Sequence, residues 1–156
     1  MNSKSVKIYH SKLNRDITNS NKLLHIYYAH SLDLYFTEIE KKDLKYLTSK
    51  KFKVVNPRDL NLGKEMIRYL YKVKDCDAVW YRGNSIGVIF EILTALTLRK
   101  PVYSLESKKK MSKDEMLNFI NTFQNNRYVD NDLFTFEYFF PDYYDDFIKM
   151  LNGDML

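Results

Sequence analysis

The sequence predicts an α/β protein with a mostly parallel sheet of four to five strands flanked by helices. Two observations carry this prediction. Short runs of apolar and aromatic residues alternate along the chain with segments of helical spacing, and the links between them are short. Because parallel strands need crossover connections, this alternation is typical of a parallel sheet that helices cover on both faces.

The first strand and the first helix follow from two adjacent patterns. Residues 23–29 form an almost continuous apolar run, which is typical of a buried strand. Residues 37–40 (TEIE) fit a capping box. They predict a helix that ends near residue 49, with Ile39, Leu44 and Leu47 facing inward.

The remaining core elements alternate in the same way. A second strand is predicted at residues 52–55 and ends before Pro57, because proline cannot continue a strand ladder. Helical spacing predicts a helix over residues 65–74, and a third strand follows at 77–81. Ser85 is a candidate N-cap for a third helix, and residues 101–105 form the fourth predicted strand.

These elements divide the chain into three parts. Residues 1–22 are polar, with one strand-like piece at 6–9, and are predicted to form an arm or an edge strand. Residues 23–106 form the α/β core. Residues 107–156 are predicted to form an aromatic-rich α+β extension that packs on the core or at a subunit interface. In it, helices at 114–124 and 143–151 flank an extended segment at 133–140.

The composition limits the classes of function. The chain has 156 residues, a net charge of +5 and one cysteine, Cys76, so we expect one compact protein with no disulfide framework. It has no continuous apolar run of about 18 residues, which predicts a cytoplasmic protein with no membrane partner. No pattern of metal-ligand spacing is present, and we expect neither a metal nor a cofactor. A basic pI of 9.1 without a recognised motif makes a nucleic-acid partner unlikely.

Glu91 is the most informative residue, because it is the single charge in the apolar stretch 85–98 (SIGVIFEILTALTL). An unpaired ionised carboxylate on a packed helix face costs several kcal/mol. The residue therefore needs a partner, a shifted pKa or a chemical role. The structural alternative is that Glu91 faces solvent, or pairs with a buried arginine, lysine or tyrosine.

Candidate ligand-binding residues lie where the predicted strands end, because parallel α/β sheets bind ligands at the carboxyl ends of their strands. Three segments meet this condition: 29–31, 56–58 and 82–85. The side chains and backbone that we expect to bind substrate are Tyr28, Ala29, His30, Ser31, Asn56, Arg58, Arg82, Asn84, Ser85 and Gly87. Three of the polar residues have alternatives. His30 is a structural residue or an acid for a leaving base, and Arg58 and Arg82 are phosphate ligands or ordinary surface residues.

The spacing of these residues indicates glycosyl chemistry. Ser85 and Gly87 lie at a helix N-terminus, where backbone N–H groups favour an anion or a hydroxyl. Glu91 lies further along the same helix, and a carboxylate can attack an anomeric carbon to form a glycosyl ester. Tyr27 or Tyr28, at a neighbouring strand end, can hold the carboxylate or the sugar by its hydroxyl.

At three places the chain resembles the nucleoside 2-deoxyribosyltransferase superfamily, which includes deoxynucleoside-monophosphate N-glycosidases. The matching segments are 27–31 (YYAHS), 77–79 (DAV) and 85–95 (SIGVIFEILTA). The last has the family's Ser-x-Gly-Val-x-x-Glu-[Ile/Leu]-x-x-Ala pattern, and the resemblance covers roughly residues 23–105.

The resemblance implies a flavodoxin-like Rossmann fold and cleavage of an N-glycosidic bond in a nucleoside or nucleotide. It implies Glu91 as the nucleophile, Tyr27 beside it, and Ser85 on the sugar or the 5′-phosphate. It also implies a homodimer or larger homo-oligomer. Two positions depart from the family pattern: Tyr69 stands where an aspartate usually handles protons on the leaving base, and Asp33 stands where the monophosphate glycosidases have an arginine.

Three hypotheses follow for the function. The first is an N-glycosidase or 2-deoxyribosyltransferase that acts through a glycosyl–Glu91 intermediate. The second is a non-catalytic module of the same fold that binds a nucleotide-derived ligand. The third, a nucleic-acid binder, rests on the basic pI and the aromatic C-terminal segment alone.

Overall fold

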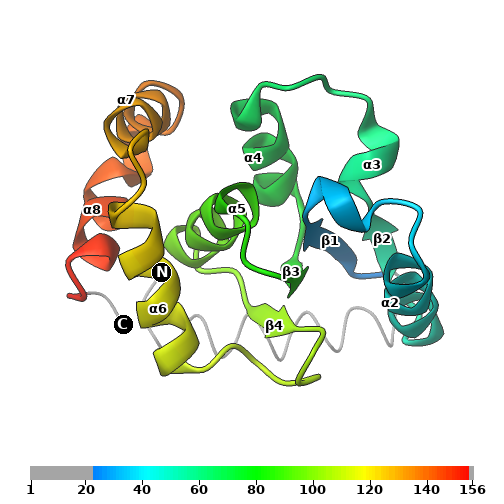
Figure 1. Cartoon of the computed structure of the whole chain (residues 1–156). Helices are drawn as coiled ribbons and strands as arrows, with labels where there is room; N and C mark the ends of the chain where they lie inside the picture. The colour runs from blue at the N-terminus through cyan, green and yellow to red at the C-terminus, as the bar shows by residue number, and fades with distance from the viewer. Residues whose placement is uncertain (1–22, 155–156) are drawn as a thin grey trace.

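The computed structural model describes residues 23–154 and contains a four-stranded, all-parallel sheet (Figure 1). The strands are β1 (His25–His30), β2 (Lys53–Val55), β3 (Ala78–Arg82) and β4 (Val102–Ser104). Their order in the sheet is β2-β1-β3-β4, which is the order of the flavodoxin-like α/β fold. The predicted fold class is thus confirmed, while the strand-like piece at 6–9 lies outside the described residues.

Helices connect and flank the strands. They are η1 (Leu32–Leu34), α2 (Glu38–Ser49), α3 (Pro57–Leu60), α4 (Met66–Asp75), α5 (Ile86–Thr97), α6 (Lys113–Gln124), α7 (Val129–Phe139), η2 (Pro141–Tyr143) and α8 (Tyr144–Leu151). The predicted core elements are all present, with ends that differ from the sequence prediction by one or two residues.

The side chains of the inner strands alternate between two cores, as the period of two in a strand requires. Tyr27 and Val79 face the larger core, which α4 and α5 close. Tyr28 and Trp80 face the smaller core, which includes Leu47 of α2. In Figure 1, α2 lies on one side of the sheet and α4 and α5 lie on the other, with α6, α7 and α8 beyond α5.

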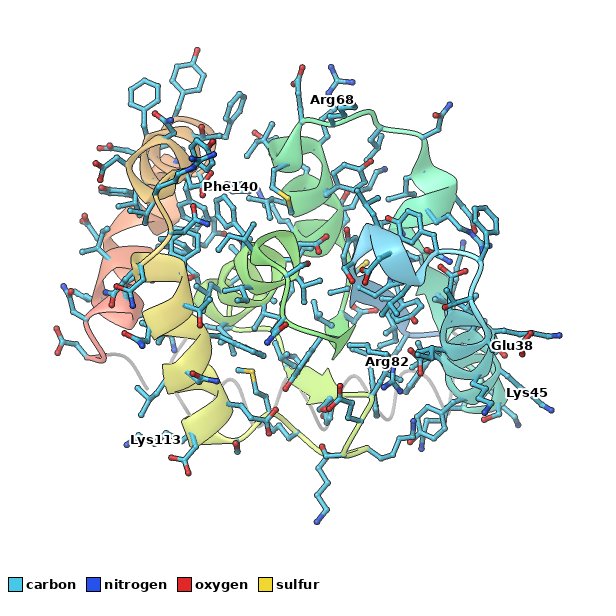
Figure 2. The ribbon with its side chains drawn as sticks, in the orientation of Figure 1. Glu38, Lys45, Arg68, Arg82, Lys113 and Phe140 are labelled. Atoms are coloured by element: carbon cyan, nitrogen blue, oxygen red, sulfur yellow. The ribbon has the colours of Figure 1, made fainter. Side chains whose placement is uncertain are left out.

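Residues 133–140 of the C-terminal extension lie in α7 and its C-cap, so the predicted extended segment there is wrong. The other long elements of the extension, α6 and α8, are helices as predicted. Aromatic residues at alternate positions suggested a strand there. The structure instead turns Val129, Leu133, Phe136 and Phe140 toward the core, and their spacing of four, three and four is that of one helix face. Phe134 is left 69% exposed, and Figure 2 shows Phe140 between α7 and α4.

The start of α2 differs from the predicted capping box. Thr37 does cap the helix, because its Oγ1 accepts the N–H of Glu40 at 3.3 Å. The Glu40 carboxylate, however, accepts the N–H of Phe36 at 3.1 Å and does not return to Thr37. Ile39 is 45% exposed, so it does not face inward as expected.

The extension should contribute to the stability of the whole domain. Phe136 and Phe147 are fully buried and stack with ring centroids 4.2 Å apart. We expect Phe136→Ala to lower the free energy of unfolding by about 3–5 kcal/mol in urea, because it leaves a cavity in the shared core. The exposed neighbour Phe134 provides a control, because Phe134→Ala should change the free energy of unfolding by less than about 0.5 kcal/mol. Equal effects would contradict this packing.

Candidate functional site

A pocket of about 750 Å³ opens at the carboxyl ends of β1 and β3, beside the first two turns of α5. This is the point where the chain reverses its direction of strand addition, and it is where α/β sheets of this order bind ligands. The pocket is lined by His30, Ser31, Leu32, Asp33, Tyr35, Pro57, Gly63, Lys64, Met66, Tyr69, Ser85, Gly87, Val88 and Glu91.

The loop between β3 and α5 sets the position of the helix N-terminus. Gly83 has φ of +85°, a left-handed conformation that glycine adopts without strain, and it turns the chain out of β3. Ser85 then caps α5, because its Oγ accepts the N–H of Val88 at 3.4 Å. The predicted N-cap is thus confirmed, and because Oγ acts as an acceptor there, the O–H of this pocket-lining residue remains a hydrogen-bond donor.

Glu91 lies in the pocket lining and pairs with Tyr27. The hydroxyl of Tyr27 donates a hydrogen bond to Glu91 Oε2, and both residues are buried. Burial raises the pKa of Glu91 to about 8, although the Tyr27 hydrogen bond acts in the opposite direction. Burial and the adjacent carboxylate also raise the pKa of Tyr27 well above its usual value. The raised pKa values favour the protonated forms of both side chains at neutral pH.

The Tyr27–Glu91 hydrogen bond agrees with both expectations for Glu91, a structural pairing with a buried side chain and a nucleophile beside Tyr27. A buried tyrosine partner is one form of the structural alternative, and Tyr27 is also the residue expected beside the nucleophile. What distinguishes the pair from a purely structural one is that Glu91 also forms part of the pocket wall.

The structure brings part of the predicted set together. His30, Ser31, Ser85, Gly87 and Glu91 all line the pocket. A neighbouring pocket of about 370 Å³ shares Ser31, Asp33 and Ser85 with it and adds Arg82 and Asn84. Ala29 does not line either pocket and is buried in the same core as Tyr27.

A carboxylate of α2 binds both Tyr28 and Arg82, although Arg82 also lines the neighbouring pocket. Tyr28 points to the opposite face of the sheet and donates to Asp43 Oδ2 at 2.6 Å. Arg82 donates to both oxygens of Asp43, at 2.6 and 2.8 Å, and lies between the end of β3 and α2 (Figure 2). This bidentate pairing takes up donors on Nε and Nη2 of Arg82, and Nη1 lies 3.9 Å from Glu106 Oε1.

Arg58 and His30 form a second such group around Glu40 of α2. Arg58 donates to Glu40 Oε1, and His30 Nε2 lies 2.7 Å from Glu40 Oε2. The other ring nitrogen of His30 lies 3.0 Å from the carbonyl oxygen of Tyr28. Both ring nitrogens thus have a hydrogen-bond partner within the protein. His30 touches the pocket as a positioned ring, and neither nitrogen is left for a leaving base.

Asn56 caps α3 and lies outside the pocket lining. Its Oδ1 accepts the N–H of Arg58 at 3.0 Å, and the residue is buried. The expected strand-end position is correct, but the side chain is used to start a helix.

Several lining residues were not expected from the sequence. They come from the segment after β1, from the loop before α4 and from the start of α4, and they include Leu32, Tyr35, Lys64, Met66 and Tyr69. Tyr69 donates to the carbonyl oxygen of Gly63 at 2.7 Å, so its hydroxyl holds the loop before α4. The resemblance did point to Tyr69 as the position of a usual aspartate, but no sequence signal marked Tyr35.

No family model, curated protein or solved structure matches the chain. The fold and the pocket therefore define its class: a flavodoxin-like α/β protein with a buried Tyr–Glu pair at the β1/β3 edge. Within residues 23–154, no helix has the length and apolar character needed to cross a membrane. The same residues contain no cluster of three or more His, Cys, Asp or Glu side chains suited to a metal ion.

The raised pKa of Glu91 predicts a pH-dependent stability. Between pH 4.5 and about pH 8 the unfolded chain loses the Glu91 proton while the folded protein keeps it, so the free energy of unfolding falls as the pH rises. Glu91→Gln removes this dependence. We expect the variant to gain several kcal/mol relative to wild type between pH 5 and pH 8, measured by urea denaturation at each pH. If the difference in free energy of unfolding between the variant and wild type did not change with pH, the raised pKa of Glu91 would be contradicted.

The Asp43 group should be structural. Asp43→Ala leaves the Tyr28 hydroxyl and most of Arg82 buried without their partner, and we expect it to lower the free energy of unfolding by about 2–3 kcal/mol. The control is Asp59→Ala, which removes an ion pair to Arg58 at 3.1 Å from a carboxylate that is 65% exposed. It should cost less than about 1 kcal/mol by the same denaturation assay. Similar losses would show that Asp43 is not a buried anchor.

Proposed function

We propose that the protein cleaves the N-glycosidic bond of a nucleoside or nucleotide, as an N-glycosidase or a 2-deoxyribosyltransferase, through a glycosyl–Glu91 ester. One observation carries this proposal: a buried carboxyl group, hydrogen-bonded to Tyr27, forms part of the wall of a pocket at the β1/β3 edge. A ligand that fills such a pocket excludes water around the carboxyl group, which favours attack on a developing cationic carbon.

The roles of the surrounding groups follow from their positions. The Glu91 carboxylate attacks the anomeric carbon as the bond to the base breaks, and water or a second base then releases the sugar. Tyr27 orients the carboxylate through its hydroxyl. Ser85 and the N-terminal turn of α5 bind a sugar hydroxyl or the 5′ end.

The charges around the pocket favour an uncharged 5′ end over a phosphate. Arg58 and Arg82 are each bound by a buried carboxylate of α2. Asp33 lines both pockets and accepts a hydrogen bond from Ser31. Lys64 adds one exposed positive charge to the lining. We therefore expect nucleosides to be better substrates than their 5′-monophosphates.

A non-catalytic binding module is the second candidate. The observation that favours it is the raised pKa of Glu91, because a carboxyl group protonated at neutral pH is a hydrogen-bond donor to a ligand and a poor nucleophile. In either case a homo-oligomer remains a prediction. Leu32 and Phe36, which are 78% and 82% exposed beside the pocket, are candidates for its contacts.

The two candidates differ in what they do to a panel of deoxynucleosides, ribonucleosides and their 5′-monophosphates. We expect chromatography to show release of free base, and Glu91→Gln to reduce kcat/KM at least about a thousandfold because it removes the nucleophile. In the wild type, kcat/KM should rise with pH up to about 8 as Glu91 ionises. The control is Glu137→Gln, on the exposed side of α7, which should retain full activity.

Other results would exclude the enzymatic proposal. Base release that persists in Glu91→Gln would remove Glu91 from the reaction. A shift in melting temperature with one ligand, without base release from any member of the panel, would instead support the binding module.

A further inference from the structure

We propose that Tyr35 is a further catalytic residue, whose hydroxyl donates a hydrogen bond to the leaving base as the glycosidic bond breaks. This inference rests on the proposed function and names the group that acts opposite Glu91. His30 was the sequence candidate for this role, but the structure engages both of its ring nitrogens. Tyr69, at the position of the family's usual aspartate, donates to a backbone carbonyl.

The backbone fixes Tyr35 at the pocket. Tyr35 is the C-terminal cap of η1, and its N–H donates to the carbonyl oxygen of Leu32 at 3.1 Å. Its side chain lines the same pocket as Glu91 but comes from a different part of the chain, the loop after β1. A substrate that places its anomeric carbon at Glu91 therefore has Tyr35 in the wall around it.

A stack of rings holds the Tyr35 side chain in place. Its ring centroid lies 5.0 Å from that of His30, at an angle of 50°. The His30 ring in turn lies flat on Tyr28, with centroids 3.7 Å apart and an angle of 4°. Because Glu40 and Asp43 bond His30 and Tyr28, the stack is anchored on α2. His30 is thus a positioning residue for Tyr35.

The Tyr35 hydroxyl is available to a ligand, unlike those of the nearby tyrosines. Tyr27, Tyr28 and Tyr69 donate to Glu91, Asp43 and the Gly63 carbonyl, respectively. Among the described residues, the Tyr35 hydroxyl has no hydrogen-bond partner. Burial, together with the nearby Glu91 and Tyr69, raises the pKa of Tyr35 to about 12. The phenol therefore keeps its proton across the working pH range and remains a donor.

The chemistry of the step defines what this donor does. The C1′–N bond breaks with its electron pair going to the base nitrogen, and a Glu91 oxygen forms the new bond to C1′. The Tyr35 O–H stabilises the negative charge that develops on the base, and keeps its proton. The departing base takes a proton from solvent, and the water that hydrolyses the ester returns one.

A pair of substrates tests this role. 2′-Deoxyguanosine releases an anionic base and needs a donor, whereas 7-methyl-2′-deoxyguanosine releases a neutral base and does not. We expect Tyr35→Phe to lower kcat/KM for 2′-deoxyguanosine about 10- to 100-fold and for the 7-methyl substrate less than about threefold. The control is Tyr103→Phe, which removes a hydroxyl from a half-buried tyrosine in the opposite core, and it should change neither value.

The outcomes separate this inference from the proposed function. Equal losses on both substrates in Tyr35→Phe, or no loss on either, would overturn the role of Tyr35 while leaving the glycosidase intact. Absence of base release from both substrates in the wild-type protein would overturn the proposed function, and the Tyr35 assignment with it. A melting temperature for Tyr35→Phe within about 2 °C of wild type shows that a selective loss is not due to unfolding.

Discussion

Two tyrosines of β1 donate hydrogen bonds to carboxylates on opposite faces of the sheet, and the rest of the structure depends on these two bonds. Tyr27 donates to Glu91 on one face of the sheet, and Tyr28 donates to Asp43 on the other. Successive residues of a strand must face opposite sides, so this single pair of neighbours ties α5 and α2 to the same central strand. The pocket lies on the Tyr27–Glu91 side, where α5, the start of α4 and the loop after β1 line it.

The two hydrogen bonds differ in what surrounds the carboxylate. This difference indicates a structural role for Asp43 and a chemical role for Glu91. Asp43 receives two N–H groups from Arg82, so its charge is neutralised and its oxygens are occupied. Glu91 receives a phenol and faces a pocket. A buried carboxyl group with one neutral partner has a raised pKa and a surface open to a ligand, which is the condition of many functional acids and bases.

Patterns over a few neighbouring residues predicted the features that depend only on those residues. The strand and helix order, the cap at Ser85 and the anomalous Glu91 depend on spacing along the chain, and these predictions agree with the structure. The positions of Arg58 and Arg82 could not be predicted, because they depend on which face of α2 presents Glu40 and Asp43.

The same limit explains two other differences between sequence and structure. The aromatic residues of α7 fit both a period of two and a helical face, and only packing on the core distinguishes them. Tyr35 lies in an irregular loop, and its place in the pocket depends on contacts with His30. The periodicity of apolar residues along the sequence does not predict such a contact.

The strand order also has a consequence for how the protein folds as it is synthesised. Among the four described strands β1 leaves the ribosome first, yet it is an inner strand of the sheet and pairs with β3 as well as β2. The Asp77 carboxylate that accepts the His25 N–H lies 52 residues further along the chain. Until β3 emerges, one edge of β1 has no neighbour, and pairing over such a separation is slow. We therefore expect the nascent chain to need protection of β1 until that late partner arrives.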